Sequence, residues 1–313
     1  MRCRFRAVTL LSLGVTASLA CAGEARFFTA GDGRLSLVSV HDGTTATVTY
    51  RRADGTYDEA ALARLRRVLR SRDGKEGPIE PRFVELLGWL YEAAGGRPLR
   101  IQSGYRSPAY NEAIRSRGAK AASGSLHTEG MAADVALEHR QADALWHRLR
   151  ERECCGAGFY PSGGFLHVDV GPPRFWDEKT SRVDENLSGG NARLFARTDF
   201  DRYGAGDAIH LGLHALTAPP VRVARTARLG GSGTPLEIAT AAADADGCIE
   251  VDALSVLVLT VPAAAHGRDT IVLTTCAPRP ERTPETVRTN PIEIEATPPP
   301  PPPAPGAPRP PRD

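Results

Sequence analysis

Residues 125–134 read SLHTEGMAAD, and this stretch gives the first indication of the fold and of a functional site. Its last residue, Asp134, lies within residues 131–137, an otherwise apolar run that is short enough to be a buried strand. An ionised carboxylate inside such a strand carries a large desolvation cost unless it is paired or bound to a metal. We therefore expect a cationic group beside Asp134.

A second motif supplies groups of the same chemistry. Residues 163–171 read GGFLHVDVG, and His167 and Asp169 are two apart in a predicted strand, so both project from the same face. A catalytic zinc site uses three His, Asp, Glu or Cys ligands and leaves one position open for water. His127, Asp134 and His167 match that number and type. The structural alternative is that an arginine satisfies the aspartate and that each histidine is a hydrogen-bonded core residue.

The sequence around these motifs predicts an α+β domain over residues 26–176, with a small antiparallel sheet and flanking helices. Alternating apolar and polar residues around a DG turn indicate a β-hairpin in residues 26–50. Asp58 and Ser107 are placed to cap helices, and Pro81 begins a further helix. The other expected elements are strands at residues 99–103, 131–137 and 165–170 and a helix at residues 140–150.

The chain changes character after this first domain. Residues 177–195 are charged and glycine-rich and are interpreted as a linker, whereas short alternating or apolar runs in residues 196–296 favour an all-β, sandwich-like domain. Residues 297–313 are mostly proline, which predicts a disordered, extended tail. Cys248 and Cys276 both fall in the β-rich region, so a disulfide between them is one expectation for an exported chain.

The N-terminus has the layout of a secretory signal peptide, which we assign to residues 1–22. Its apolar run is too short to favour a membrane span, and Cys21 raises the alternative of a lipid-anchored mature chain. We therefore expect an exported, monomeric protein of the periplasm or cell envelope with no transmembrane segment in its mature form. A net charge of +2 gives no support to a nucleic-acid partner.

The spacing SxHxxGxAxD in residues 125–134, preceded by SGYRS and followed by HVD, resembles the zinc D-alanyl-D-alanine peptidase superfamily. That superfamily includes VanX-type dipeptidases, lysostaphin-type enzymes and the Hedgehog signalling domain. In particular, the chain is similar to the YcbK-like (MepK-type) murein endopeptidases, in the hairpin that begins with FF and GDG and in the block GFYP…HVDVGPPRFW. This resemblance covers residues 26–176, about half of the chain. It implies a zinc metallopeptidase that cleaves the peptide stems of peptidoglycan, as a murein endopeptidase or a D,D-carboxypeptidase.

The same resemblance implies a role for each residue of the motifs. His127, Asp134 and His167 bind Zn²⁺, and Arg106 orients the substrate. Arginine suits that task because its planar fork can bind a peptide carboxylate or a carbonyl oxygen that becomes negative. Ser125 supports the ligand loop through a hydrogen bond. Read without the resemblance, Arg106 can instead form a salt bridge at the start of a helix.

A general base is also expected at such a site. The better-known dipeptidases of the superfamily carry an acid three residues before the last histidine, and this chain has Gly164 there. Asp169 is our first candidate for the base, and Glu129 is the second. Asp169 can instead hold the ring of His127 in the required tautomer.

The missing acid keeps a second function open, namely a cell-wall peptide-binding module that retains the zinc and the fold but does not hydrolyse. Two other zinc classes fit less well. Residues 127–129 read HTE, like the start of the nucleobase deaminase motif, but the later cysteines read ECCG instead of PCxxC. The chain also has no HExxH pair, which would place two ligands on one helix turn.

Overall fold

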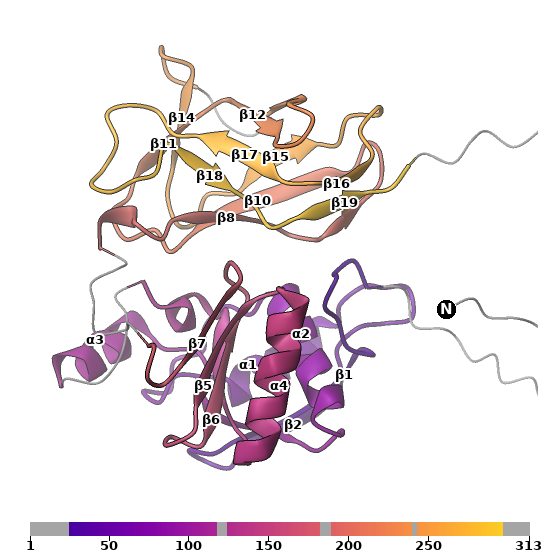
Figure 1. Cartoon of the computed structure of the whole chain (residues 1–313), viewed down its shortest axis with the longest axis vertical. Helices are drawn as coiled ribbons and strands as arrows, with labels where there is room; N and C mark the ends of the chain where they lie inside the picture. The colour runs from indigo at the N-terminus through magenta and orange to yellow at the C-terminus, as the bar shows by residue number, and fades with distance from the viewer. Residues whose placement is uncertain (1–24, 118–123, 182–188, 240–242, 297–313) are drawn as a thin grey trace, which may run out of the picture.

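The computed structural model describes residues 25–117, 124–181, 189–239 and 243–296. Figure 1 shows two parts that face each other: a first part with four helices and a large sheet, and a second part built from strands. The predicted signal peptide, Cys21 and the proline-rich tail lie outside the described residues. Within the described residues, no helix is long and apolar enough to cross a membrane.

The first part is organised around a seven-stranded sheet with the strand order β2-β1-β3-β4-β6-β5-β7. Most neighbours are antiparallel, but β1 pairs with β3 and β5 pairs with β7 in parallel. The expectation of a small antiparallel sheet was therefore wrong in size, and it holds for four of the six neighbouring strand pairs. The strands are β1 (Arg34–Ser39), β2 (Thr45–Thr49), β3 (Leu99–Ser103), β4 (Ala132–Ala136), β5 (Gly156–Tyr160), β6 (Phe165–Asp169) and β7 (Arg174–Asp177).

Strand β5 was not predicted, because its sequence GAGFY contains two glycines and lacks the alternation of a typical strand. The structure supplies the reason for both glycines. A Cβ atom at Gly156 would collide with the carboxylate of Asp169, and one at Gly158 would collide with the ring of Trp176. Close approach of these two side chains to the backbone therefore requires residues without a Cβ at both positions.

The helices begin where the sequence predicted. Asp58 accepts a hydrogen bond from the backbone N–H of Ala61 at the start of α1, and Ser107 accepts one from the N–H of Tyr110 at the start of α3. Helix α1 packs against β1 and β2, α2 against β1, and α4 against β5 and β6. Their bounds are α1 (Glu59–Val68), α2 (Pro81–Ala93), α3 (Pro108–Ser116) and α4 (His139–Arg152).

A buried polar cluster joins α2 to the hairpin. The carboxylate of Glu85 is fully buried, forms an ion pair with Arg51, and accepts hydrogen bonds from the hydroxyl groups of Tyr50 and Tyr57. It also accepts one from the N–H of Gly31. A buried charge with this many partners is compensated, so the cluster fixes α2 against the sheet that carries the site.

The second part contains strands in four sheets, together with a short 3₁₀ turn, η2 (Gly189–Asn191), over its described residues. It has an apolar core of its own, which includes Leu211, Val223, Leu259 and Ile271. The strands are β8 (Phe195–Thr198), β9 (Arg202–Tyr203), β10 (Ala208–His214), β11 (Val221–Ala224), β12 (Thr226–Leu229), β13 (Pro235–Glu237), β14 (Cys248–Val251), β15 (Leu257–Thr260), β16 (Gly267–Asp269), β17 (Ile271–Thr274), β18 (Thr286–Arg288) and β19 (Ile292–Ile294).

Cys248 and Cys276 form a disulfide, as the sequence suggested, and they are 28 residues apart. Closing a loop of this length restricts the unfolded chain and contributes about 3–4 kcal/mol to stability. The double variant Cys248→Ser/Cys276→Ser should therefore unfold at a distinctly lower temperature in calorimetry. Reductant should lower the unfolding temperature of the unchanged chain but should not change the unfolding temperature of the double variant. Equal unfolding temperatures for the two oxidised proteins would contradict this expectation.

Candidate metal centre

The candidate ligands come from two adjacent strands of the sheet and from the turn that precedes one of them. Asp134 on β4 lies directly opposite His167 on β6, and Ser103 at the end of β3 lies opposite Asp134 on the other side. His127 belongs to the 3₁₀ turn η1 (Leu126–Glu129), which leads into β4. The backbone N–H of Arg106 donates to the carbonyl of His127 and ties this turn to the segment after β3.

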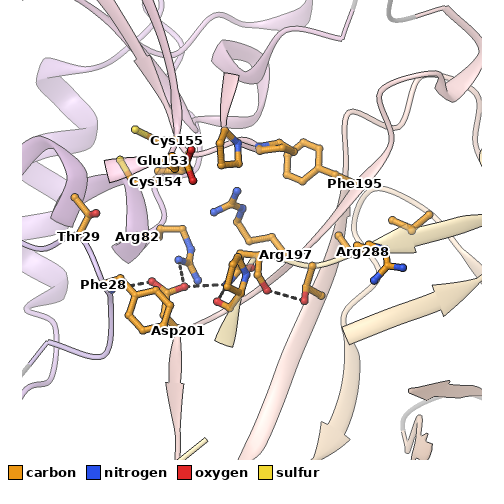
Figure 2. A pocket seen from close by; sticks show the side chains of 18 of the residues that line it. Phe28, Thr29, Arg82, Glu153, Cys154, Cys155, Phe195, Arg197, Asp201 and Arg288 are labelled. Atoms are coloured by element: carbon orange, nitrogen blue, oxygen red, sulfur yellow. Dashed lines mark hydrogen bonds and ion pairs between the residues drawn. The ribbon is translucent and has the colours of Figure 1, made fainter. Parts of the chain in front are cut away.

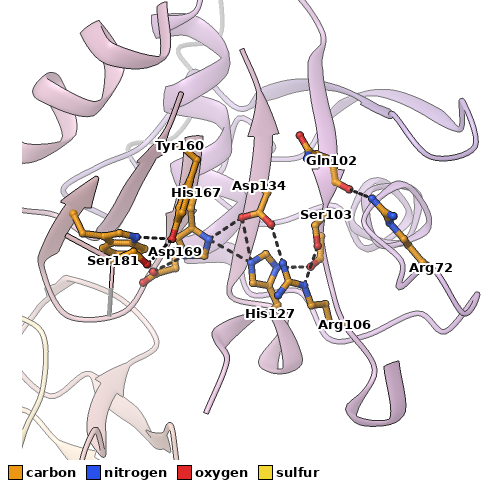
Figure 3. A network of polar contacts seen from close by, with 12 residues as sticks. Arg72, Gln102, Ser103, Arg106, His127, Asp134, Tyr160, His167, Asp169 and Ser181 are labelled. Carbon is orange, nitrogen blue, oxygen red and sulfur yellow. Dashed lines mark hydrogen bonds and ion pairs between the residues drawn. The ribbon is translucent and has the colours of Figure 1, made fainter. Parts of the chain in front are cut away.

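The structure brings the side chains of His127, Asp134 and His167 together (Figure 3). His167 Nδ1 lies 2.9 Å from Asp134 Oδ1, and His127 Nε2 lies 3.4 Å from the same oxygen. The two ring nitrogens are 3.3 Å apart. One nitrogen or oxygen from each residue therefore lies within 4.8 Å of the others, which is close enough for one metal ion to contact all three.

The other ring nitrogen of each histidine has a hydrogen-bond partner that fixes the tautomer. His127 Nδ1 lies 2.7 Å from the carbonyl oxygen of Gly104, which can only accept, so this nitrogen carries the proton. His167 Nε2 lies 3.0 Å from Asp169 Oδ2 and donates to it in the same way. The free lone pairs are then on His127 Nε2 and His167 Nδ1, the two atoms that face Asp134. Histidines held by such partners are typical of metal sites, and the donor set fits zinc.

The pKa shifts of Asp134 and His127 favour an ionised carboxylate and a neutral ring, whereas the shift of His167 favours a protonated ring. Burial raises the pKa of Asp134, but the neighbouring His127 and His167 outweigh it and hold the pKa well below its usual range. Burial lowers the pKa of His127. For His167, burial lowers the pKa, but Asp134 and Asp169 outweigh burial and raise the pKa of this ring.

Arg106 lies beside the cluster, with 14% of its side chain exposed. Its Nη2 donates to Asp134 Oδ2 at 2.8 Å, and its Nε donates to Ser103 Oγ at 3.0 Å. The guanidinium therefore holds the carboxylate oxygen that does not face the histidines. Arg106 thus forms a salt bridge, which the sequence offered as the alternative to a role in substrate binding, and its partner is one of the candidate ligands.

Asp169 lies at the site but contacts His167, not His127. It is fully buried, and its Oδ2 also accepts from Arg174 while its Oδ1 accepts from the N–H of Gly171. Burial raises its pKa, but Arg174 and His167 outweigh burial and keep the carboxylate ionised. The expectation that Asp169 holds the ring of His127 was wrong, because the carbonyl of Gly104 occupies that position.

Glu129 is engaged by the second part of the chain. Its Oε2 lies 2.8 Å from His214 Nδ1, and its Oε1 accepts from the N–H of Ala215 at 2.9 Å. Both oxygens are thus bonded to residues at the end of β10. Ser125 is buried, but its side chain forms no capping hydrogen bond; its backbone carbonyl accepts from the N–H and the hydroxyl of Thr128.

Several residues around the cluster were not singled out from the sequence. Arg174 pairs with Asp169, and the ring of Trp176 lies 5.3 Å from that of His167. Trp176 in turn donates to the hydroxyl oxygen of Tyr160 at 2.8 Å. Arg174 and Trp176 lie in the block GPPRFW, where aromatic and basic residues directly after the ligand strand were the available signal.

Asp169→Asn should weaken metal binding by about 10–100-fold, because the amide can donate to His167 Nε2 and favour the wrong tautomer. The measurement is the zinc dissociation constant by competition with a chelating dye. Asp143→Asn, an exposed change on α4, is the matched control and should bind zinc normally. An unchanged zinc dissociation constant in the Asp169 variant would show that this carboxylate does not affect metal affinity.

Two strands and the turn before them bring two histidines and an aspartate to one point, with an arginine beside them, and this is the arrangement expected for the zinc D-alanyl-D-alanine peptidase superfamily. The family model described as peptidoglycan L,D-endopeptidase MepK matches residues 28–176. The chain is 32% identical to peptidoglycan L,D-endopeptidase MepK of Escherichia coli (strain K12) over 144 residues, which are 45% of this chain and 79% of that protein. It is 27% identical over 123 residues to the probable MepK of Haemophilus influenzae, covering 38% and 66% of the two chains. The chain therefore belongs to the MepK family of this superfamily.

Proposed function

We propose that this chain is a zinc-dependent peptidoglycan endopeptidase that cleaves peptide bonds in the cross-links between stem peptides. The observation that carries the proposal is the convergence of His127 Nε2, Asp134 Oδ1 and His167 Nδ1, each fixed by a second hydrogen bond or ion pair, in a chain of the MepK family. Because the named relatives are L,D-endopeptidases, the linkage that we infer is an L,D bond.

The proposed ligands are His127, Asp134 and His167, and the metal that suits them is zinc. Zinc held by these residues would supply a bound water of lowered pKa and would polarise the scissile carbonyl. Three protein ligands leave a fourth position for that water, which is the pattern of catalytic zinc sites.

The residues around the ligands have distinct proposed tasks. Gly104 and Asp169 hold the two imidazoles in the tautomers that direct a lone pair at the metal. Arg106 uses two of its donors on Ser103 and Asp134, and its remaining N–H groups can donate to a substrate carbonyl or carboxylate. Oxygen that becomes negative during peptide cleavage is stabilised by such a fixed cation.

Asp169 and Glu129 are better suited to positioning than to accepting a proton from water. A general base needs a free oxygen within reach of the proton that it takes. Each oxygen of either carboxylate is already bonded to another group of the protein. We infer that Asp169 positions His167, and that Glu129 anchors the ligand turn η1 to β10.

Mass analysis of products from defined cross-linked muropeptides tests the function. Incubation with substrates that carry either an L,D or a D,D cross-link should release monomers from the L,D substrate. Asp134→Asn, which keeps the shape of the side chain, should release none. Metal-dependent binding of both substrates without any cleavage would contradict the enzyme and support the alternative, a catalytically silent zinc-containing module that binds cell-wall peptides.

The proposed location is the periplasm or another part of the cell envelope, where peptidoglycan lies. The disulfide between Cys248 and Cys276 fits an oxidising compartment outside the cytoplasm. Residues 1–22 are the proposed signal peptide, and lipid attachment at Cys21 remains the alternative for the mature N-terminus. We propose that the protein acts as a monomer.

A further inference from the structure

A cavity of about 670 Å³ lies between the two parts of the chain (Figure 2). The first part contributes residues of α2 and the segments that follow α4 and β6, and the second part contributes β8 and the segment around β18. Its volume is in the range of small-molecule sites. None of His127, Asp134, His167 and Arg106 lines it, so the cavity is separate from the candidate metal centre.

Arg197 on β8 projects into this cavity next to Arg82 (Figure 2). Only 6% of Arg197 is exposed, and its buried Nε has no hydrogen-bond partner. Among the described residues, the contact found for its guanidinium is with the ring of Phe195, whose centroid is 5.6 Å away. Burial and the like charge of Arg82 lower the pKa of Arg197 to about 9 and outweigh the opposing effect of the nearby acids Glu80, Asp201 and Asp169, so the side chain is still a cation at neutral pH.

Asp201 lines the cavity beside Arg82, and its negative charge is already compensated. Asp201 forms an ion pair with Arg82 and accepts hydrogen bonds from the N–H of Phe28 and the amide of Asn290. The cavity lining as a whole has five arginines and two acids, which is an excess of three positive charges. An uncompensated buried charge is strongly unfavourable, and buried charges are therefore normally paired.

We propose that the cavity binds a small organic anion whose carboxylate pairs with Arg197 and whose apolar body lies against Phe195 and Pro172. A guanidinium presents parallel N–H donors that match a carboxylate in two-point geometry. The apolar part of the lining, which includes Leu86, Val170 and Val287, suits an aliphatic or aromatic body. This site lies outside the peptidase function proposed above and does not depend on it.

Thermal unfolding and calorimetric titration of the purified mature chain test the proposal, with hexanoate as the probe and hexanamide as its uncharged counterpart. At constant ionic strength, saturating hexanoate should raise the unfolding temperature by roughly 3 °C, because a ligand that binds only the folded state stabilises it. Hexanamide should produce no shift. Inorganic phosphate serves as a second anion, and a shift with phosphate but not with hexanoate would contradict the carboxylate assignment.

The decisive variant is Arg197→Met, which removes the charge and keeps an unbranched, flexible side chain. It should lose the response to hexanoate, and without ligand it should unfold at a higher temperature than the unchanged chain, because a buried unpaired cation has been removed. Arg197→Gln carries the same expectation for ligand response if the methionine variant does not fold. Arg228→Met, an exposed change on β12, is the control and should keep the response.

Two results would overturn the proposal. A hexanoate response that persists in both Arg197 variants would place the anion elsewhere, including at the metal centre. A lower unfolding temperature for Arg197→Met, combined with no hexanoate response in the unchanged chain, would show that Arg197 only stabilises the fold.

Discussion

Replacement of His127, Asp134 or His167 by alanine should lower the rate of cross-link cleavage by more than about 10³-fold. Loss of a single donor to a developing oxyanion already costs about 10²–10³ in rate. A ligand variant that loses the metal loses the activated water and the polarisation of the carbonyl together. The expected loss is therefore larger than that for replacement of the neighbouring Arg106.

Release of muropeptide monomers and zinc content per chain should be measured together in these variants. Circular dichroism then checks that each variant is folded. His210→Ala, which removes an exposed histidine on β10, is the control and should retain both zinc and activity. A folded His167→Ala variant with normal zinc content and normal cleavage would be incompatible with the proposed ligand set.

Arg106→Gln should lower kcat for cross-link cleavage by about 10²–10³-fold. The guanidinium holds the outer oxygen of Asp134 and leaves further donors for the substrate. Glutamine keeps a hydrogen-bond donor but removes the charge and the planar fork, so stabilisation of negative oxygen is lost. Arg106→Lys should recover only part of the rate, because an ammonium group cannot make two-point contacts.

The zinc content of the Arg106 variants separates two explanations of the loss. Normal zinc content with a low kcat supports contact with the substrate, whereas low zinc content means that Arg106 acts through Asp134. Arg72→Gln is the matched control, because Arg72 is exposed and donates to the carbonyl of Gln102 on β3. Unchanged kcat in a folded Arg106→Gln variant would remove Arg106 from the reaction.

The position of the candidate site could be predicted because its residues conflict with their surroundings. Asp134 stood in an apolar run, and His167 and Asp169 shared one face of a predicted strand. Both inferences depend only on local rules, namely the cost of a buried charge and the two-residue period of a strand. The structure accordingly places Asp134 opposite His167 in neighbouring strands.

The features that sequence reasoning missed depend on contacts between distant segments. Glu129 was considered as a base, but its partner His214 is 85 residues away in the second part of the chain. The edge of the seven-stranded sheet is formed by the parallel pairing of β5 with β7. Strand β5 was not predicted because it contains two glycines. Arg197 was not singled out from the sequence, because its burial at the cavity depends on residues from distant segments such as Arg82.

Removal of the metal from the purified chain tests the central claim most directly. The chain should be treated with a chelator, freed of the chelator, and incubated with peptidoglycan before and after addition of zinc. We predict that release of monomers stops in the metal-free chain and returns when about one zinc ion per chain is added. Undiminished release from a chain shown to contain no metal would contradict the account.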